Sequence, residues 1–365
     1  MGKRILFVSP RLGQGGAERQ MVTIAQLLKH KGYDVEVLCY SYGNFFEDLL
    51  HQNGIPVYWK QHNYLLRLIT CTWFIQRKNY DVVISFLPTP SFINCFAASF
   101  RKKWIVITGE RSSVVKAPTS VMSKIYSWYR RFSDYIVCNS DNARRMWEEV
   151  FPTYKEKMRT IYNTVILGNI TSEYIPKQDG KLHVCIAASI YGTKNPLGLV
   201  KAILLMTDEE RDRIVIDWYG RSQAQIGDTR IYDETCAQIA EHRLQSVLRL
   251  HDATKDIANI MNQSDSVALF SDHEGLPNAI CEGMMLGKPI VMTCVSDYNT
   301  LIEDGKNGFL CDWDHPESIK SALLRMVELS SEQLIQKGCL SKEKAKRLFS
   351  EEKIISDWIK LFEKK

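Results

Sequence analysis

The sequence of 365 residues predicts two α/β domains, each built on a doubly wound parallel sheet of the Rossmann-like type. Three observations predict this fold class. Short apolar runs of strand character alternate with longer segments of helical periodicity. The alternation stops over residues 168–180, which are rich in Gly, Thr, Ser, Pro and Gln, and then begins again. The chain is also too long for one ordinary core but suits two domains of roughly 150–180 residues each.

The first half contains six strand-like runs, each followed by a helical segment. The expected strands cover 4–10, 33–40, 55–59, 81–87, 104–110 and 135–140, and the expected helices cover 17–31, 45–53, 64–78, 91–100, 119–132 and 141–150. Parallel strands need crossover connections, and helices of this length provide them. We therefore expect a first domain over residues 1–168.

The second half repeats the pattern after the linker. Its expected strands cover 183–190, 213–220, 246–253, 265–271, 288–294 and 307–313, and its expected helices cover 195–207, 229–243, 255–263, 277–286 and 316–329. This predicts a second domain over residues 181–349. The terminal segment 350–365 follows, with an apolar stripe at helical spacing that consists of Ile354, Ile355, Trp358, Ile359 and Phe362.

Composition restricts the class of protein. No early basic-then-apolar signal segment is found, and no apolar run reaches the roughly 20 residues that span a bilayer. The ten cysteines are scattered, with no C-x-x-C pair, and Cys39, Cys185 and Cys294 lie in apolar runs, which predicts buried thiols in a reducing cytosol. A net charge of +5 does not by itself indicate nucleic acid. We expect a cytoplasmic protein.

The most informative stretch is 271–291, which places Glu274 and Glu282 on either side of a strand-to-helix junction. Glu274 is expected on the loop after a buried strand, and Glu282 inside the helix that Pro277 begins. Ligands of open parallel sheets bind at the carboxyl ends of the strands, where helix amino termini attract anions. A sugar diphosphate suits this place, with Glu282 holding a ribose diol. The expected sugar contacts are Glu274, Gly275, Leu276, Pro277 and Asn278. The alternative is that both glutamates are solvated charges near a helix start.

The pattern E-G-L-P-N-A-x-x-E-x-M-x-x-G-K-P-I-V, beginning at Glu274, resembles the signature of the retaining glycosyltransferases of family 4, the glycosyl transferases group 1 enzymes with the GT-B fold. The resemblance implies two Rossmann-like domains facing a deep cleft, with the donor on the carboxyl-terminal side and the acceptor on the amino-terminal side. It also implies that segment 350–365 returns to the first domain. Packing of that segment on its own domain is the alternative.

Three further loops match the family at strand ends. Gly15 and Gly16 resemble its G-G-A-E loop and are expected to contact donor or acceptor, unless they only form a tight turn. Lys194, followed by Asn195, is expected beside the donor diphosphate, where an ammonium stabilises a departing anion. Ser189 stands where the family usually has an arginine. Stabilisation of the leaving group could therefore rest on Lys194 and helix dipoles, or on another basic residue such as Arg221, which follows Gly220 in a matching turn.

Glu110 ends the fifth predicted strand of the first domain, where many relatives carry a histidine. It is expected to accept a sugar hydroxyl or to position the acceptor hydroxyl. A surface ion pair with Arg111 is the alternative. Asp312 and Asp314 imitate a metal motif, but they precede a proline-started helix, and the GT-B architecture does not rely on a bound metal. No metal or other cofactor is therefore expected.

Residues 100–132 combine Lys and Arg with Trp and Tyr. This composition suits an anionic membrane surface, or else a core-packed helix with solvated charges. An RNA-binding module is not recognisable, and no nucleic-acid partner is expected.

The resemblance thus implies a retaining, metal-independent, hexosyltransferase-type enzyme. It would move a sugar from a nucleotide diphosphate sugar to an acceptor hydroxyl in bacterial surface polysaccharide or lipid-linked glycan assembly, in the cytoplasm or on the inner face of the plasma membrane. A nucleotide-sugar 2-epimerase and a non-catalytic nucleotide-sugar-binding protein are the alternatives.

Overall fold

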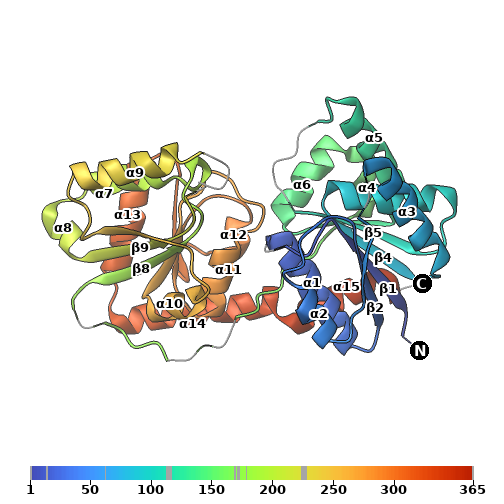
Figure 1. Cartoon of the computed structure of the whole chain (residues 1–365). Coiled ribbons are helices and arrows are strands. Elements are labelled where there is room, and N and C mark those ends of the chain that lie inside the picture. Colours follow the sequence, from blue (N-terminus) through green and yellow to red (C-terminus); the bar gives the residue numbers. More distant parts are fainter. Residues whose placement is uncertain are drawn as a thin grey trace. The chain divides into compact units, whose positions relative to one another are not determined.

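The computed structural model describes residues 2–13, 15–61, 63–111, 117–167, 170, 173–177, 179–222 and 228–363. The chain divides into two compact units, each an α/β domain with one parallel sheet (Figure 1). Unit 1 comprises Met1–Thr164 and Glu351–Lys365, and unit 2 comprises Val165–Ser350. The two parallel sheets confirm the predicted fold class. The first domain was expected to extend to residue 168, whereas unit 1 ends at Thr164 before it resumes in the terminal segment.

Unit 1 contains a seven-stranded sheet in the order β3-β2-β1-β4-β5-β6-β7. Its strands are β1 (Arg4–Ser9), β2 (Asp34–Cys39), β3 (Val57–Trp59), β4 (Val82–Phe86), β5 (Ile105–Glu110), β6 (Tyr135–Cys138) and β7 (Met158–Thr160). Its helices are α1 (Gly16–His30), α2 (Glu47–Gln52), α3 (Tyr64–Arg77), α4 (Pro88–Phe100), α5 (Val121–Tyr129), η1 (Arg130–Phe132), α6 (Asp141–Val150), η2 (Pro152–Lys157) and α15 (Glu351–Glu363).

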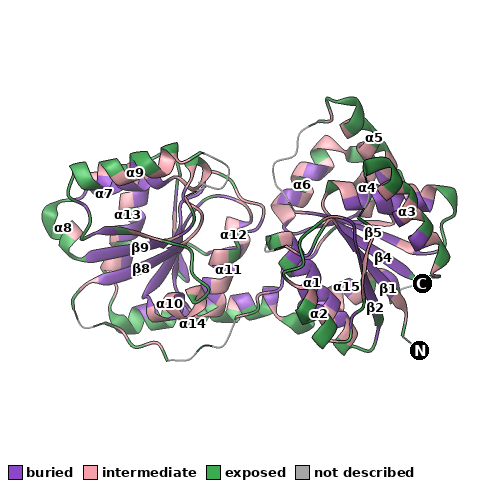
Figure 2. Cartoon of the chain, viewed as in Figure 1, coloured by how far each residue is buried: buried purple, intermediate pink, exposed green. Residues whose placement is uncertain are grey.

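The sheet of unit 1 is buried on both faces, as its near-continuous apolar strands require. In β1, Ile5 and Phe7 pack into one core cluster, while Leu6 and Val8 pack into the other. Successive side chains of a strand point to opposite faces of the sheet, so one strand contributes side chains to both core clusters. Figure 2 shows the strands as the most buried elements of each unit.

Helix α15 completes the core of unit 1. Ile354, Ile355, Trp358 and Phe362 are all buried in the cluster that contains Ile5 and Phe7. The indole ring of Trp358 lies 5.8 Å from the ring of Phe86 at the end of β4. The apolar stripe that the sequence shows in the terminal segment therefore packs on unit 1.

Unit 2 contains a six-stranded parallel sheet in the order β10-β9-β8-β11-β12-β13. Its strands are β8 (Leu182–Ala187), β9 (Ile214–Tyr219), β10 (Leu248–His251), β11 (Ser266–Leu269), β12 (Ile290–Thr293) and β13 (Gly308–Cys311). Its helices are η3 (Gly192–Lys194), α7 (Pro196–Leu204), α8 (Asp208–Asp212), α9 (Arg230–Glu241), α10 (Ile257–Gln263), α11 (Asn278–Met285), α12 (Tyr298–Leu301), α13 (Pro316–Val327) and α14 (Ser331–Phe349).

Some elements differ from the prediction. Helix α14, with 19 residues, was not predicted, although Ser330 and Gln333 form the capping box that marks its start. Helix α4 begins at Pro88 rather than at residue 91, because proline favours the first turn of a helix. Cys294 was expected to be buried but is exposed, since β12 ends one residue before it. Parts of the predicted linker and of the basic segment 100–132 lie outside the described residues.

Candidate functional site

The carboxyl ends of β8 and β11 bring two loops of unit 2 together. These strands are neighbours in the sheet, so the loop that leads from β8 into η3 lies beside the loop that leads from β11 into α11. The backbone N–H of Asp272 donates to the carbonyl of Thr193 at 3.0 Å. This bond fixes one loop against the other and places Lys194 next to Glu274.

Lys194 and Glu274 form an ion pair at this point. The ammonium of Lys194 donates to Oε1 of Glu274, and the hydroxyl of Ser271 donates to the same oxygen at 2.7 Å. The side chains of Lys194 and Glu274 expose 15% and 13% of their surfaces. The pair is thus held in position and is mostly buried, but it keeps the partial contact with solvent that a displaceable contact requires.

Two side-chain hydroxyl groups hold the backbone in and just before the loop from Glu274 to Asn278. The hydroxyl of Ser296 donates to the carbonyl of Gly275, and the hydroxyl of Thr293 donates to the carbonyl of Ser271 at 2.6 Å. Leu276 and Pro277 are buried, whereas Asn278 is exposed at the start of α11. The loop therefore keeps its polar groups at the surface on a fixed backbone.

Helix α11 lies tightly on β11 because Gly283 allows it. A Cβ atom at Gly283 would lie 2.8 Å from the Cβ atom of Val267 on that strand. Glu282, one residue earlier and partly buried, lies one turn inside the helix as predicted.

The other predicted donor contacts of unit 2 lie at the same edge of its sheet. Ser189 is partly buried after β8, and Gly220 follows β9 with a backbone N–H donated to the carbonyl of His251 at 3.0 Å. A Cβ at Gly220 would lie 1.9 Å from the carbonyl oxygen of Ala188, so this position requires glycine. The carbonyl of the exposed Arg221 accepts a backbone bond from Ile190 at 2.9 Å, which joins the β8 and β9 loops.

Asn195 stabilises the start of helix α7. Its backbone is left-handed, with φ of 60°, and its side-chain amide donates to the carbonyl of Trp313 at 2.7 Å. This bond holds the start of α7, immediately after Lys194.

The remaining predicted residues belong to unit 1. Gly15 precedes α1 and Gly16 is its first residue, so both lie at the carboxyl end of β1. Glu110 ends β5 at the same edge of that sheet and is buried.

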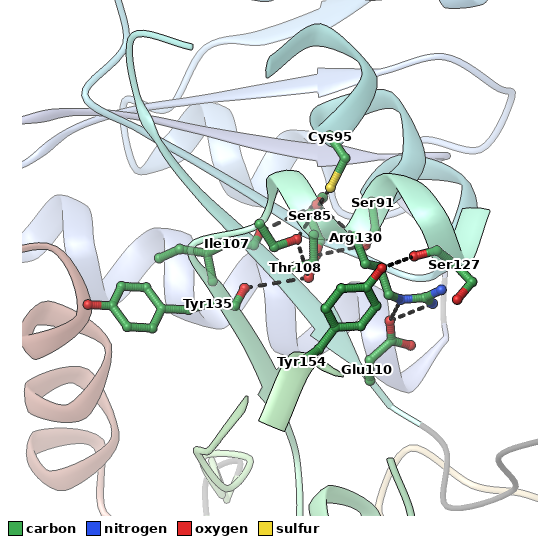
Figure 3. Close-up of polar contacts among 11 residues, drawn as sticks. Ser85, Ser91, Cys95, Ile107, Thr108, Glu110, Ser127, Arg130, Tyr135 and Tyr154 are labelled. Atoms are coloured by element: carbon green, nitrogen blue, oxygen red, sulfur yellow. Dashed lines mark hydrogen bonds and ion pairs between the residues drawn. The ribbon is translucent and has the colours of Figure 1, made fainter. Parts of the chain in front are cut away.

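The alternative of a surface ion pair between Glu110 and Arg111 is wrong. Glu110 instead accepts two hydrogen bonds from Arg130, from Nη2 at 2.8 Å and from Nε at 3.1 Å (Figure 3). The side chains of Arg130 and Glu110 expose only 9% and 5% of their surfaces. The guanidinium of Arg130 also lies over the ring of Trp147, 4.6 Å from its centre. The pair is buried because η1 turns Arg130 inward.

A network of small polar side chains surrounds this pair. The hydroxyl of Thr108, two residues before Glu110 on β5, lies 3.2 Å from the hydroxyl of Ser133. Tyr154 donates to the carbonyl of Ser127 at 2.9 Å (Figure 3). Beside it lies a hollow of about 350 Å³. Its lining includes Pro88, Ser123, Tyr126, Arg130, Trp147 and Phe151.

Arg111, which the sequence suggested only as a partner of Glu110, has other contacts. Its Nη1 donates to the side-chain oxygen of Asn163 at 2.8 Å, and its guanidinium lies over the ring of Phe86, 3.9 Å from the centre. Nε and Nη2 are buried without a hydrogen-bond partner among the described residues. Burial lowers the pKa of Arg111 to about 10. Unsatisfied donors on a buried cation are typical of an anion-binding position.

The two aspartates that imitate a metal motif lie in the loop between β13 and α13. The N–H of Asp312 donates to Ser318 at 3.1 Å, and Asp314 contacts His315. Within the described ranges, no group of three His, Cys, Asp or Glu side chains is arranged to hold a metal ion. None of the described helices is both long and apolar enough to cross a bilayer.

Comparisons with known proteins agree with this architecture. Residues 14–168 match the model of Glycosyltransferase Family 4, and residues 181–328 match that of Glycosyl transferases group 1. An Escherichia coli relative, UDP-Gal:alpha-D-GlcNAc-diphosphoundecaprenol alpha-1,3-galactosyltransferase, is 19% identical, and the match covers 90% of this chain and 88% of the relative. A Campylobacter jejuni relative, GalNAc-alpha-(1->4)-GalNAc-alpha-(1->3)-diNAcBac-PP-undecaprenol alpha-1,4-N-acetyl-D-galactosaminyltransferase, is 24% identical, and the match covers 98% of each chain.

The fold also matches solved structures. Anabaena HepE, whose structure was solved in complex with UDP, superposes with a TM-score of 0.82 at 19% identity, and the match covers 99% of each chain. The conclusion rests on the two family matches, on the two sheets of parallel strands, and on the Lys–Glu pair at the carboxyl ends of the strands in the second sheet. The chain belongs to the family 4 glycosyltransferases of the GT-B fold.

Proposed function

We propose that this protein transfers a sugar, with retention of the anomeric configuration, from a uridine diphosphate sugar to a hydroxyl of a lipid-linked glycan. The observation that carries the proposal is the Lys194–Glu274 pair, held at the carboxyl ends of β8 and β11 by Ser271 and by the Asp272 backbone bond. Two relatives are named for transfer to undecaprenol-linked acceptors, and a neighbouring structure holds UDP. These names support the choice of donor and acceptor class.

In this proposal Lys194 changes partner when the donor binds. The diphosphate takes the place of Glu274 at the ammonium, and the released carboxylate accepts hydrogen bonds from the sugar hydroxyls. Lys194 then stabilises the negative charge that grows on the leaving group, without moving far. Glu282 holds the ribose, and Gly275 to Asn278 enclose the sugar ring.

The chemistry is a same-face substitution at the anomeric carbon. The bond from this carbon to the diphosphate oxygen breaks, and its electron pair leaves with the diphosphate. The acceptor oxygen forms the new bond on the same face, through a state of oxocarbenium character, and passes its proton to the departing phosphate oxygen. No metal ion takes part in this scheme. Positioning and electrostatic stabilisation supply the rate.

Nucleotide binding tests the donor class. Thermal unfolding is measured with UDP, GDP, ADP and CMP, each at the same concentration. We expect UDP to raise the unfolding temperature most, since a ligand that binds only the folded state stabilises it more the tighter it binds. Preferential stabilisation by GDP or ADP would refute the uridine assignment while leaving the transferase assignment intact.

Product analysis tests the reaction. The protein is incubated with a radiolabelled UDP-sugar and undecaprenyl diphosphate-linked oligosaccharides, and the new linkage is examined by proton NMR. An α-linked product from an α-linked donor is expected. An inverted product would refute retention. Epimerised donor without acceptor would instead establish the 2-epimerase, and nucleotide binding without any turnover would establish a binding protein.

A further inference from the structure

Helices α3 and α5 carry an apolar surface that no other described element covers. Its members are all large apolar residues that expose between 37% and 76% of their surfaces. They are Tyr64, Leu65, Leu66, Ile69 and Trp73 on α3, Phe100 at the end of α4, and Val121, Met122, Ile125 and Trp128 on α5. We call these ten residues the α3–α5 face.

Contacts through α4 and Tyr126 join the two helices that carry the α3–α5 face. Helix α4 packs between the two helices, and the ring of Phe92 on α4 stacks on that of Tyr126 on α5 at 4.5 Å. The hydroxyls of Tyr64 and Tyr126 lie 3.0 Å apart, which joins the start of α3 to α5. Figure 2 shows exposed segments on both helices.

The spacing shows that the exposure is systematic. Leu65, Ile69 and Trp73 follow one another at four-residue intervals and form a stripe along α3. Cys71, Phe74 and Ile75 of the same helix are buried in the core. Helix α3 is therefore apolar on its inner and its outer side, which is typical of a helix with a second apolar environment.

The sequence segment that contains α3, α4 and α5 is strongly basic. Residues 64–133 contain eleven Lys and Arg but only two Asp and Glu, whereas the rest of the chain contains 36 and 40. The net charge of +5 thus divides into +9 in this segment and −4 elsewhere. The two acids are Asp81, at the start of β4, and the buried Glu110, so neither lies on α3, α4 or α5.

Basic side chains lie beside the exposed rings. The guanidinium of Arg77 lies 4.5 Å from the ring centre of Trp73, and that of Arg131 lies 5.0 Å from the ring centre of Trp128. Lys124 on α5 is exposed as well. Tryptophan next to lysine and arginine is the composition of proteins that rest at a lipid headgroup layer, with rings among the acyl chains and cations at the phosphates.

We propose that the α3–α5 face docks unit 1 on the surface of an anionic lipid bilayer. The inference goes beyond sugar transfer, and it extends the basic segment 100–132 to a surface in which α3 takes an equal part. A second copy of the chain is a poorer occupant, because a two-fold contact would press two surfaces of like charge together.

Vesicle sedimentation tests the proposal in the absence of any donor, so its outcome is independent of the transfer reaction. The full chain is mixed with phosphatidylcholine vesicles, with or without phosphatidylglycerol. We expect it to sediment with the anionic vesicles alone and to be released as salt is added. Failure to bind the anionic vesicles would overturn the proposal.

Matched variants locate the contact. Lys124→Gln with Arg131→Gln should lower the partition coefficient about thirtyfold, at about fivefold for each charge lost. Leu65→Ser with Trp128→Ser should lower it at least about tenfold by removing inserted apolar area.

The controls for these variants lie on α14. They are Lys346→Gln with Arg347→Gln, and Ile335→Ser with Leu340→Ser. These four residues are similarly exposed and should leave partition unchanged. Equal losses in controls and test variants would refute the assignment of the face.

Two measurements distinguish bilayer docking from self-association. Quenching of tryptophan fluorescence by lipids with brominated acyl chains should occur in the wild type and diminish in Trp128→Phe, which preserves the apolar surface. Light scattering in the absence of lipid should give the mass of one chain. A dimer that the Leu65→Ser, Trp128→Ser variant dissolves would instead establish a contact between copies and overturn the bilayer proposal.

Discussion

Each unit holds a carboxylate and a cation at the carboxyl edge of its sheet, but in different surroundings. In unit 1, Arg130 gives Glu110 two hydrogen bonds, both side chains are buried, and the guanidinium of Arg130 lies over the ring of Trp147. In unit 2, Lys194 and Glu274 meet where solvent still reaches both. Burial thus separates a fixed ion pair from one that a ligand can open.

The reason lies in the cost of leaving a charge without a partner. A ligand that competes for Glu110 would have to expose or desolvate Arg130, which is expensive inside a protein. At Glu274 the same exchange occurs in contact with water, where a diphosphate replaces one anion by another. The expected sugar contact of Glu110 is therefore less suited to its surroundings than a role in shaping the hollow beside Arg130.

The largest effect is expected from breaking the buried pair. Glu110→Gln leaves the guanidinium of Arg130 buried without its anion, and we expect it to lower the free energy of unfolding by about 3–5 kcal/mol. Urea unfolding measures the change. Replacing both residues, as Glu110→Gln with Arg130→Met, should recover much of the loss. A Glu110→Gln protein that is as stable as the wild type but inactive would instead support the expected direct contact between Glu110 and the substrate.

The open pair should respond in the opposite way. Glu274→Gln and Lys194→Met should each reduce kcat by about 10²–10³-fold, since each removes one electrostatic contact to the reacting sugar diphosphate. The unfolding temperature should fall less than in Glu110→Gln, because the charge that remains keeps partial contact with water. The matched control is Lys306→Met, which removes the exposed Lys306–Glu303 pair of the same unit and should retain full activity.

A third cation, Lys288, sharpens the comparison because it is buried against an aromatic ring. Its ammonium lies 3.4 Å from the ring centre of Tyr174, with Asp265 and Lys342 nearby. Burial lowers the pKa of Lys288 from 10.5 to about 7, and the Asp265 charge only partly opposes this effect.

Between those two pH values the unfolded chain binds more protons than the folded one, so the contribution of Lys288 to stability should increase as pH rises through this window. Local relaxation around the charged form limits the total change to about 2–3 kcal/mol. Below pH 7 the contribution should be constant. This contribution is measured by urea unfolding of the wild type and Lys288→Met at several pH values. The difference between their free energies of unfolding isolates Lys288, because the effects of the other titrating groups cancel. A constant difference would contradict the lowered pKa.

The smallest effect concerns the backbone that supports the open pair. Gly283→Ala would place a methyl group 2.8 Å from Val267, so α11 must move away from β11. We expect a loss of about 1–3 kcal/mol in the free energy of unfolding. Because α11 follows the Glu274 loop, UDP should also bind more weakly. An equally stable variant with normal binding would show that the loop tolerates this shift.

The α3–α5 face shows how much the sequence could predict. The basic and aromatic segment at 100–132 was visible in one window of sequence, and with it the hypothesis of an anionic partner. Helix α3 was predicted too, but a stripe such as Leu65, Ile69 and Trp73 predicts an inward face wherever a core is available. Only the packing of α3 on α4 shows that the stripe lies outside.

The sequence by itself determined the two parallel sheets, the family and the loop that carries Glu274, because strand and helix periodicity and the E-G-L-P-N signature are local in the chain. Tertiary structure decided the partners. It joined Lys194 to Glu274, 80 positions apart, buried Glu110 against Arg130, and left two donors of Arg111 unsatisfied among the described residues. Burial and pairing depend on segments that meet only after folding, and a charge takes its chemical character from them.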